Sequence, residues 1–225
     1  MTTIKRIVSD IDGTLVDDQG QLLPATIKGV QAAVAQGAQM VLASARSPKG
    51  MFGIAQQLGI NSTMIAYNGA LTATTDVNDQ LTVYEQCAIQ PRVTDLAVWL
   101  KRTPTPVHKI MIMADPDVIQ AIEQRLMSDE FEQLAVYRSK DTYLEIVAAG
   151  VTKAAALIKL LQDDQVTPAE AIAFGDNFND VAMLQTGGVG IAMANAPQAV
   201  KNAANTVTTD NNHDGIQATL ARYFS

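Results

Sequence analysis

The feature that most constrains the fold is an alternation of short apolar runs with helical patterns at both ends of the chain. Three apolar runs predict buried strands, at residues 4–9, 40–43 and 64–67. Between them, Pro24 can open a helix over residues 24–35, and Pro48 can open one that ends near Gly59. Connections this short predict a parallel sheet with helices on both faces.

The same alternation returns after residue 150. Strands are predicted at residues 171–174, 189–193 and 206–208, and helices at 152–161, around 181–184, from 197 to 201 and at 215–223. The intervening stretch has a different pattern of a strand near 81, a helix at 92–102, a strand at 109–114, a helix at 117–128, and a hairpin of strands at 134–139 and 142–147. We therefore predict an α/β core of residues 1–80 and 150–225, with an α+β module of residues 81–149 inserted into it.

Charge and cysteine content exclude several classes of function. The formal net charge of −7 repels phosphates at long range, which argues against binding to nucleic acid or to an anionic membrane. Cys87 is the single cysteine, so the chain can form neither an internal disulfide nor a thiolate metal cluster. The N-terminal residues lack a signal-peptide pattern, and no apolar run approaches the roughly 20 residues of a membrane span. We expect a soluble, cytoplasmic protein.

Two acidic side chains follow the first predicted strand directly. Asp10 and Asp12 lie in the run Asp-Ile-Asp-Gly-Thr, where Gly13 permits a sharp exit and close approach of the backbone to a ligand. Ligands of parallel sheets bind beyond the carboxyl ends of the strands. Two carboxylates this close favour a divalent cation, and Mg²⁺ prefers carboxylate and phosphate oxygens. Asp-x-Asp-Gly is also an ordinary turn sequence, so this run alone does not decide.

A second polar loop, residues 175–180, follows the strand at 171–174. It supplies Asp176, Asn177, Asn179 and Asp180 to the same predicted edge of the sheet. Capping the next helix would need only one such residue. The four together indicate an oxygen-rich site for a hard metal ion.

Hydroxyl and basic side chains occupy comparable positions. Ser44 and Arg46 follow the second strand, where a hydroxyl, backbone amides and a guanidinium can bind phosphate oxygens. Taken alone, Ser44 would be a helix cap. Lys153 begins the first helix after the inserted module; a lysine there is usually solvated and lies unfavourably against the helix dipole. That placement hints at an anion nearby.

With these four motifs in order, the sequence resembles the haloacid dehalogenase superfamily, and within it the Cof-like phosphatases with an α/β cap. The resemblance covers residues 4–75 and 150–224 and implies a Rossmann-like core, with the inserted module as the cap. It also implies a cytoplasmic enzyme that hydrolyses a small phosphorylated metabolite, as a monomer or homodimer.

The resemblance further implies residue roles. Asp10 would become phosphorylated, and Asp12 would act as general acid and then as base. Mg²⁺ would be held by Asp10, the backbone carbonyl of Asp12 and Asp176, with Asn179 or Asp180 completing or orienting the shell. Ser44 and Lys153 would bind the transferring phosphoryl group, with Arg46 and Asn68 near the substrate.

The sequence departs from the family pattern in two places. Ala45 replaces a more usual glycine, and the inserted module is shorter than in many Cof-like proteins, resembling the small caps of archaeal-type phosphoglycolate phosphatases and of sucrose- or mannosylglycerate-phosphate phosphatases. The cap offers cations for a second anionic group of a substrate, most of them expected to be solvated: His108, Lys109, Arg125, Arg138 and Lys140. Three alternatives stay open: a phosphomutase of the same superfamily, a phosphoaspartate signalling receiver, and a catalytically inactive binding module.

Overall fold

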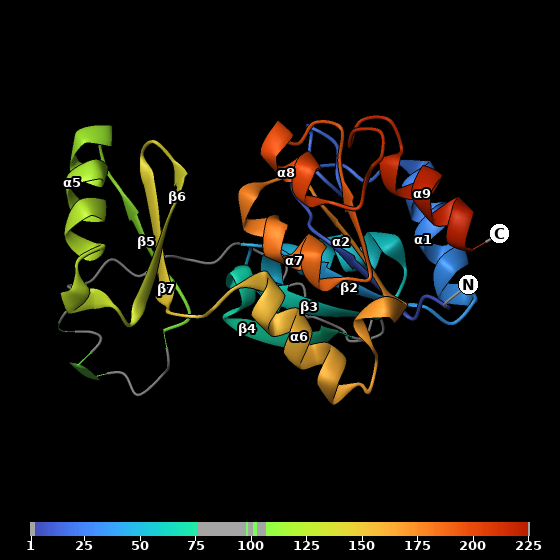
Figure 1. Ribbon diagram of the computed structural model, residues 1–225, viewed down its shortest axis with the longest axis horizontal. Coiled ribbons are helices and arrows are strands. Elements are labelled where there is room, and N and C mark those ends of the chain that lie inside the picture. The colour runs from blue at the N-terminus through green and yellow to red at the C-terminus, as the bar shows by residue number, and fades with distance from the viewer. Residues whose placement is uncertain (1–2, 76–97, 99–100, 103–106, 225) are drawn as a thin grey trace. The chain divides into compact units, whose positions relative to one another are not determined.

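The fold is described from a computed structural model that covers residues 3–75, 98, 101–102 and 107–224. The chain divides into two compact units (Figure 1). The core unit comprises Met1–Asp79 and Gly150–Ser225, and the inserted unit comprises Gln80–Ala149. Each unit is described by itself.

The core unit is built on a seven-stranded sheet in the order β10-β9-β8-β1-β2-β3-β4. The strands are β1 (Arg6–Ser9), β2 (Gln39–Ala43), β3 (Ser62–Ala66), β4 (Leu71–Thr75), β8 (Ala171–Gly175), β9 (Val189–Ala192) and β10 (Thr206–Val207). All neighbouring pairs are parallel except β3 and β4. This confirms the predicted α/β class with a mostly parallel sheet.

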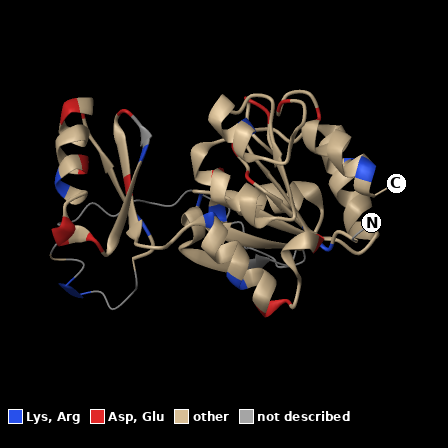
Figure 2. Ribbon diagram, in the orientation of Figure 1, with Lys and Arg blue, Asp and Glu red and all other residues tan. Residues whose placement is uncertain are grey.

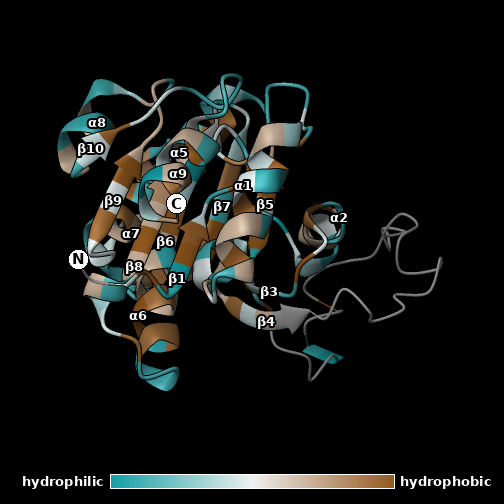
Figure 3. Cartoon of the chain, turned by 90° about the vertical axis from the view of Figure 1, so that its right-hand side faces the viewer, coloured by the Kyte–Doolittle hydropathy of each residue, from teal (hydrophilic) through white to brown (hydrophobic). Residues whose placement is uncertain are grey.

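Helices cover both faces of this sheet. One layer contains α1 (Pro24–Ala35), α2 (Pro48–Leu58) and α9 (Gly215–Tyr223), and the other contains α6 (Lys153–Asp163), α7 (Val181–Thr186) and α8 (Gln198–Ala203). β8 and β9 consist of apolar residues and glycine, largely brown in Figure 3, and β1 carries Ile7 and Val8 between the buried Arg6 and Ser9. Apolar residues predominate because both faces of these strands are buried.

Local sequence explains where the helices begin and end. Ser47 caps α2 by accepting a hydrogen bond from the Gly50 amide, and Gly59 ends the helix in the left-handed conformation with φ 65°. Thr152 caps α6 by accepting one from the Ala155 amide. The Thr152 cap places Lys153 at the first position of α6.

The antiparallel edge strand β4 was not predicted. Tyr67, expected to end the preceding strand, instead opens a tight turn in which Tyr67, Asn68 and Gly69 all have positive φ, at 52°, 56° and 106°. The turn reverses the chain, and the threonine-rich run after it pairs with β3 from Leu71 to Thr75. Asn-Gly followed by β-branched residues is a hairpin signal that the sequence did contain.

The inserted unit has a three-stranded antiparallel sheet in the order β5-β7-β6. Its described elements are β5 (Ile110–Met113), α5 (Pro116–Leu126), β6 (Leu134–Lys140) and β7 (Tyr143–Ala148). The predicted hairpin of the last two strands is confirmed, and Ile119 of α5 is buried with Leu144 of β7. The strand predicted near residue 81 and most of the helix predicted over residues 92–102 lie outside the described residues.

Among the described residues, no helix combines the length and the apolar character that crossing a bilayer would require.

Candidate active site

The acidic residues meet at the ends of β1 and β8, two adjacent strands in the middle of the sheet. β1 lies between β2 and β8, and Ser9 is in register with Leu42 on one side and Phe174 on the other. The path from β1 runs toward β2, whereas the path from β8 runs toward β9, so the loops after β1 and β8 diverge. Such a switch point is where open α/β sheets bind ligands. Asp10 follows β1, and Asp176 follows β8.

Gly13 and Thr14 bring the two loops into contact. The Thr14 hydroxyl donates a hydrogen bond to Asp176 Oδ1 at 2.6 Å. Gly13 has φ +83°, and a Cβ atom there would lie 2.5 Å from Asp176 Oδ2. Only glycine fits this position without moving the Asp176 carboxylate, so the contact between the two loops requires Gly13.

Asp180 folds back onto its own loop and is fully buried. Its Oδ2 accepts hydrogen bonds from the amides of Asp176 and Asn177, at 3.1 and 3.0 Å. A Cβ at Gly175 would lie 2.5 Å from the Asp180 Cβ, so a side chain there would displace it. Asp180 thus shapes the loop that presents Asp176.

Lys153 joins these acids from the start of α6. Its ammonium Nζ donates to Asp10 Oδ1 at 2.6 Å and to Asp180 Oδ1 at 2.7 Å, and the side chain is 1% exposed. The general expectation that a lysine at a helix start is solvated is therefore wrong here. Gly69 permits this placement, because a Cβ at that position would lie 2.2 Å from the Thr152 carbonyl oxygen.

The cluster carries more negative charge than its one lysine neutralises. Burial raises the pKa of Asp10 to about 7, against the lowering effect of Lys153, and the nearby Asp180 and Asp176 raise it further. Burial also raises the pKa of Asp176 to about 6. Burial alone would lower the pKa of Lys153, but attraction to Asp10 and Asp180 outweighs it and the pKa is raised.

The excess negative charge of this cluster fits a divalent cation. Asp10, Asp176 and Asp180 each offer a carboxylate oxygen, and these oxygens lie within 4.8 Å of one another. Hard oxygen donors with excess negative charge are what Mg²⁺ requires. The side chain of Asp12 lies outside this group. The contact with the ion that was predicted for the Asp12 backbone carbonyl stays a prediction.

Ser44, Asn68 and Asn179 form a second set of contacts around the same edge. The Ser44 carbonyl accepts from the Asn68 amide at 3.0 Å, and the Ser44 hydroxyl accepts from the Arg46 amide at 3.1 Å. The Asn179 side-chain amide donates to Asn68 Oδ1 at 3.2 Å. Asn179 therefore links the loop after β8 to the turn after β3; its predicted contact with a metal ion stays a prediction.

Arg46 does not extend toward the buried cluster but binds Asp12. Its Nε donates to Asp12 Oδ2 at 2.9 Å and a terminal nitrogen donates to Oδ1 at 2.5 Å. Its other terminal nitrogen donates to the Gly50 carbonyl at 3.2 Å. The phosphate contact predicted for Arg46 remains untested.

Sequence reasoning gave no role to two asparagines that hold the loop after β1. The Asn195 side-chain amide donates to the Gly13 carbonyl at 2.8 Å. The buried Asn211 donates to the Val16 carbonyl at 3.1 Å and to Asp18 at 3.0 Å. The adjacent Asn211 and Asn212 in the loop before α9 were a usable signal, since asparagine side chains in loops often hydrogen-bond to backbone.

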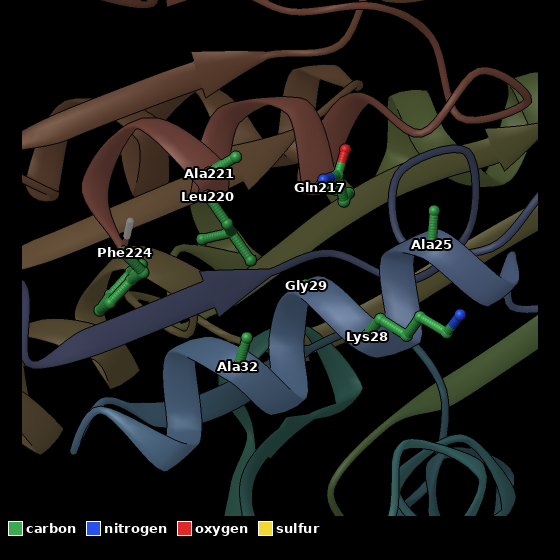
Figure 4. Close-up of a pocket in the computed structure, with 8 residues that line it drawn as sticks. All are labelled: Ala25, Lys28, Gly29, Ala32, Gln217, Leu220, Ala221 and Phe224. Carbon is green, nitrogen blue, oxygen red and sulfur yellow. The ribbon is translucent and has the colours of Figure 1, made fainter.

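A separate hollow of about 270 Å³ lies between α1 and α9 (Figure 4), lined by Ala25, Lys28, Gly29, Ala32, Gln217, Leu220, Ala221 and Phe224. None of the predicted site residues lines it. Apart from Lys28 and Gln217 its lining is apolar and it contains no carboxylate, so the acidic cluster at the sheet edge is the candidate active site.

In the inserted unit, three of the predicted cations are engaged by acids of the same unit. Lys109 binds Glu145 at 3.1 Å, Arg125 binds Glu130 at 2.5 Å, and Arg138 binds Glu123. Figure 2 shows both signs of charge on α5. The Lys140 side chain lies outside the described residues.

Comparison with known proteins agrees with the motifs. The family model for haloacid dehalogenase-like hydrolases matches residues 7–102 and 99–220. A Haemophilus influenzae protein, provisionally described as a phosphatase, is 31% identical with 98% of both chains covered. The 5-amino-6-(5-phospho-D-ribitylamino)uracil phosphatase YcsE of Bacillus subtilis is 26% identical, with 98% of this chain and 96% of that protein covered.

Among solved structures, a haloacid dehalogenase-like hydrolase from Bacteroides thetaiotaomicron matches with a TM-score of 0.84 and 26% identity, over 99% of this chain and all of that one. The chain thus belongs to the haloacid dehalogenase-like hydrolases, and within them to the Cof-like phosphatases whose motifs it carries.

Proposed function

We propose that the chain is a Mg²⁺-dependent phosphatase that hydrolyses phosphomonoesters of small metabolites through an aspartyl phosphate on Asp10. The observation that carries this proposal is the buried contact of Lys153 with Asp10 and Asp180, beside Asp176. A carboxylate held at a ligand-binding edge, next to a fixed ammonium group, is suited to attack a phosphorylated substrate.

In the first step, an oxygen of Asp10 bonds to phosphorus while the bond from phosphorus to the leaving oxygen breaks. Asp12 donates its proton to that oxygen, which departs as an alcohol. In the second step, Asp12 takes a proton from water as the water oxygen bonds to phosphorus. The bond to Asp10 then breaks, and inorganic phosphate is released.

Lys153 and Ser44 are proposed to bind the transferring group. The Lys153 ammonium lies against the nucleophile, where it can neutralise charge on phosphoryl oxygens. The Ser44 hydroxyl accepts a hydrogen bond from the Arg46 amide, and a hydroxyl that accepts one bond can still donate its hydrogen to phosphate.

Mg²⁺ would be held by Asp10 and Asp176, with Asp180 orienting the loop. Once bound, the ion offsets the negative charge of the carboxylates and of the substrate phosphate.

The proposal is tested by phosphate release from p-nitrophenyl phosphate in the presence of Mg²⁺. We expect turnover by the native protein and none by Asp10→Asn, with Asp163→Asn as a matched control because Asp163 is exposed on the far end of α6. Full activity of Asp10→Asn, or no activity of the native protein, would overturn the proposal.

A panel of phosphorylated metabolites would identify the substrate class. Phosphoglycolate, hexose phosphates and phosphorylated ribitylaminouracil cover the groups suggested by the short cap and by the relatives. Transfer of phosphate between two positions of one sugar, without free phosphate, would instead indicate the phosphomutase alternative. Membership in the haloacid dehalogenase-like hydrolases excludes the alternative of a phosphoaspartate signalling receiver.

A further inference from the structure

We infer that Asn195 is a positioning residue for the metal site, because it holds the Gly13–Thr14 peptide group and, through that group, the carboxylate of Asp176. The inference rests on the proposed function, in which Asp176 is a ligand of Mg²⁺. Asn195 lies in the turn after β9, outside every motif from which the sequence predicted a site residue.

The Gly13–Thr14 peptide group contacts Asp176 through both of its residues. The Gly13 backbone lies so close to the carboxylate that an added Cβ would be 2.5 Å from Asp176 Oδ2. The Thr14 hydroxyl donates a hydrogen bond to Asp176 Oδ1 at 2.6 Å. A rotation of this peptide group would therefore disturb the contacts that orient Asp176.

Asn195 restrains that rotation. Its side-chain amide donates to the Gly13 carbonyl at 2.8 Å, and the Thr14 amide, at the other end of the same peptide group, donates to the Ile11 carbonyl at 3.3 Å. The backbone of a glycine is conformationally permissive, and Gly13 has φ +83°. The hydrogen bond from Asn195 thus supplies a restraint that the glycine backbone lacks.

The turn that carries Asn195 is itself fixed to the core. The Met193 amide donates at 3.0 Å to the carbonyl of Gly175, the last residue of β8. Met193 and Ala196, on either side of the turn, are 0% and 4% exposed. The turn after β9 therefore contacts both acidic loops, the loop after β8 through Met193 and the loop after β1 through the bond from Asn195 to Gly13.

Loss of this hydrogen bond should weaken Mg²⁺ binding without unfolding the protein. Groups that orient a metal ligand contribute about 10–100-fold in affinity, and Asn195 acts one contact further away, so we expect Asn195→Ala to raise the Mg²⁺ dissociation constant about fivefold. Isothermal titration calorimetry at pH 8 measures this constant. Because Asn195 is exposed, the Tm of the metal-free variant should fall by less than about 3 °C.

Gln198→Ala is the matched control. Gln198 is exposed three residues further on, and its side-chain amide donates to Asn202 Oδ1 at 2.8 Å. The substitution removes an amide hydrogen bond of the same length that does not reach the acidic loops, so we expect native Mg²⁺ affinity. A comparable loss of affinity in Gln198→Ala, or a lowered Tm of Asn195→Ala with native affinity, would show a merely structural role and overturn the inference.

Phosphate release provides a second readout. The Mg²⁺ concentration that gives half-maximal activity of Asn195→Ala should rise about fivefold, while kcat at saturating Mg²⁺ stays within about twofold of the native value. A fall in kcat that saturating Mg²⁺ does not recover would contradict a role through the metal ligand.

A double-mutant cycle with Thr14→Val tests the route through the hydroxyl. Of the two contacts with Asp176, only the hydroxyl forms a directional bond, and valine keeps the shape of the side chain without it. In the Thr14→Val background, Asn195→Ala should raise the dissociation constant by less than about twofold.

A further fivefold rise in that background, or native affinity of the single variant Asn195→Ala, would overturn the inference. A native protein that binds Mg²⁺ and shows these differences between variants, but releases no phosphate, would instead overturn the proposed function alone.

Discussion

The ion pairs of Lys153 in the core unit and the ion pair of Arg125 with Glu130 in the inserted unit differ mainly in burial. Lys153 in the core is 1% exposed and contacts two carboxylates, whereas Arg125 and Glu130 in the inserted unit are 60% and 62% exposed. Desolvating charges costs free energy that hydrophobic packing would not incur. Charged groups are buried despite this cost where chemistry requires them in fixed positions. Exposed charges, which only keep a surface hydrated, do not incur it.

The largest expected effect in this comparison comes from Lys153→Met. It leaves Asp10 and Asp180 buried without their cation, so we expect stability to fall by about 3–5 kcal/mol and phosphatase activity to be lost. Urea unfolding and phosphate release measure the two effects. Mg²⁺ should recover part of the stability, because it supplies the missing positive charge.

Lys159→Met is the matched control on the same helix. Lys159 binds Asp163 four residues on, and both side chains are more than half exposed. We expect a change of about 0.5 kcal/mol or less and full activity. A loss as large as that of Lys153→Met would show that burial does not explain the contrast.

Gly13→Ala should have the next largest effect. The new methyl group would meet Asp176 at 2.5 Å in addition to the strain of φ +83°, so we expect phosphatase activity to fall by about 100-fold and stability by about 2 kcal/mol. Gly20→Ala shares the positive φ, at +74°, but has no atom within 4 Å of the added methyl group. It should cost about 1 kcal/mol and leave activity intact; similar activity losses in both variants would contradict the contact with Asp176.

The pH dependence of metal binding tests the charge surplus of the core. Because the pKa values of Asp10 and Asp176 are raised to about 7 and about 6, the folded, metal-free protein binds more protons between pH 4 and 7 than the unfolded chain does. Its stability from these groups therefore falls as pH rises through that window. Mg²⁺ displaces those protons, so its affinity should rise by more than about tenfold from pH 5 to 6, where both groups carry protons, and by up to about tenfold from pH 6 to 7.

Isothermal titration calorimetry at pH 5, 6, 7 and 8 would measure this affinity. A Mg²⁺ affinity that does not change over the range would argue against an ion bound by Asp10 and Asp176. Above pH 8 both carboxylates are ionised, and the affinity should level off.

The smallest effect is expected from Arg125→Ala in the inserted unit. It removes the exposed contact with Glu130 and the stacking of the guanidinium over the Phe131 ring, at 5.1 Å from its centroid. We expect a loss of about 1 kcal/mol or less, seen as a small shift in Tm. A loss of several kcal/mol would mean that exposed pairs of this unit matter as much as the buried ones of the core.

The sequence predicted which residues gather at the site more completely than it predicted the contacts between them. The positions of Asp10, Asp176 and Lys153 after strands or at a helix start placed them at one edge of a parallel sheet, because strand ends in such a sheet meet there. The partnership of Arg46 with Asp12 could not be predicted, since a flexible side chain after a strand can turn toward either of two neighbouring loops. The edge strand β4 was missed because a five-residue run next to a turn carries little periodicity.

The sequence by itself determined the alternating fold, the order of the motifs and the family, because buried strands, caps and glycine turns are encoded by neighbouring residues. Only the tertiary structure decided the protonation balance of the acids and the burial of Lys153. Those properties depend on the distances and desolvation that arise when residues more than a hundred positions apart, such as Asp10 and Lys153, come within hydrogen-bonding reach.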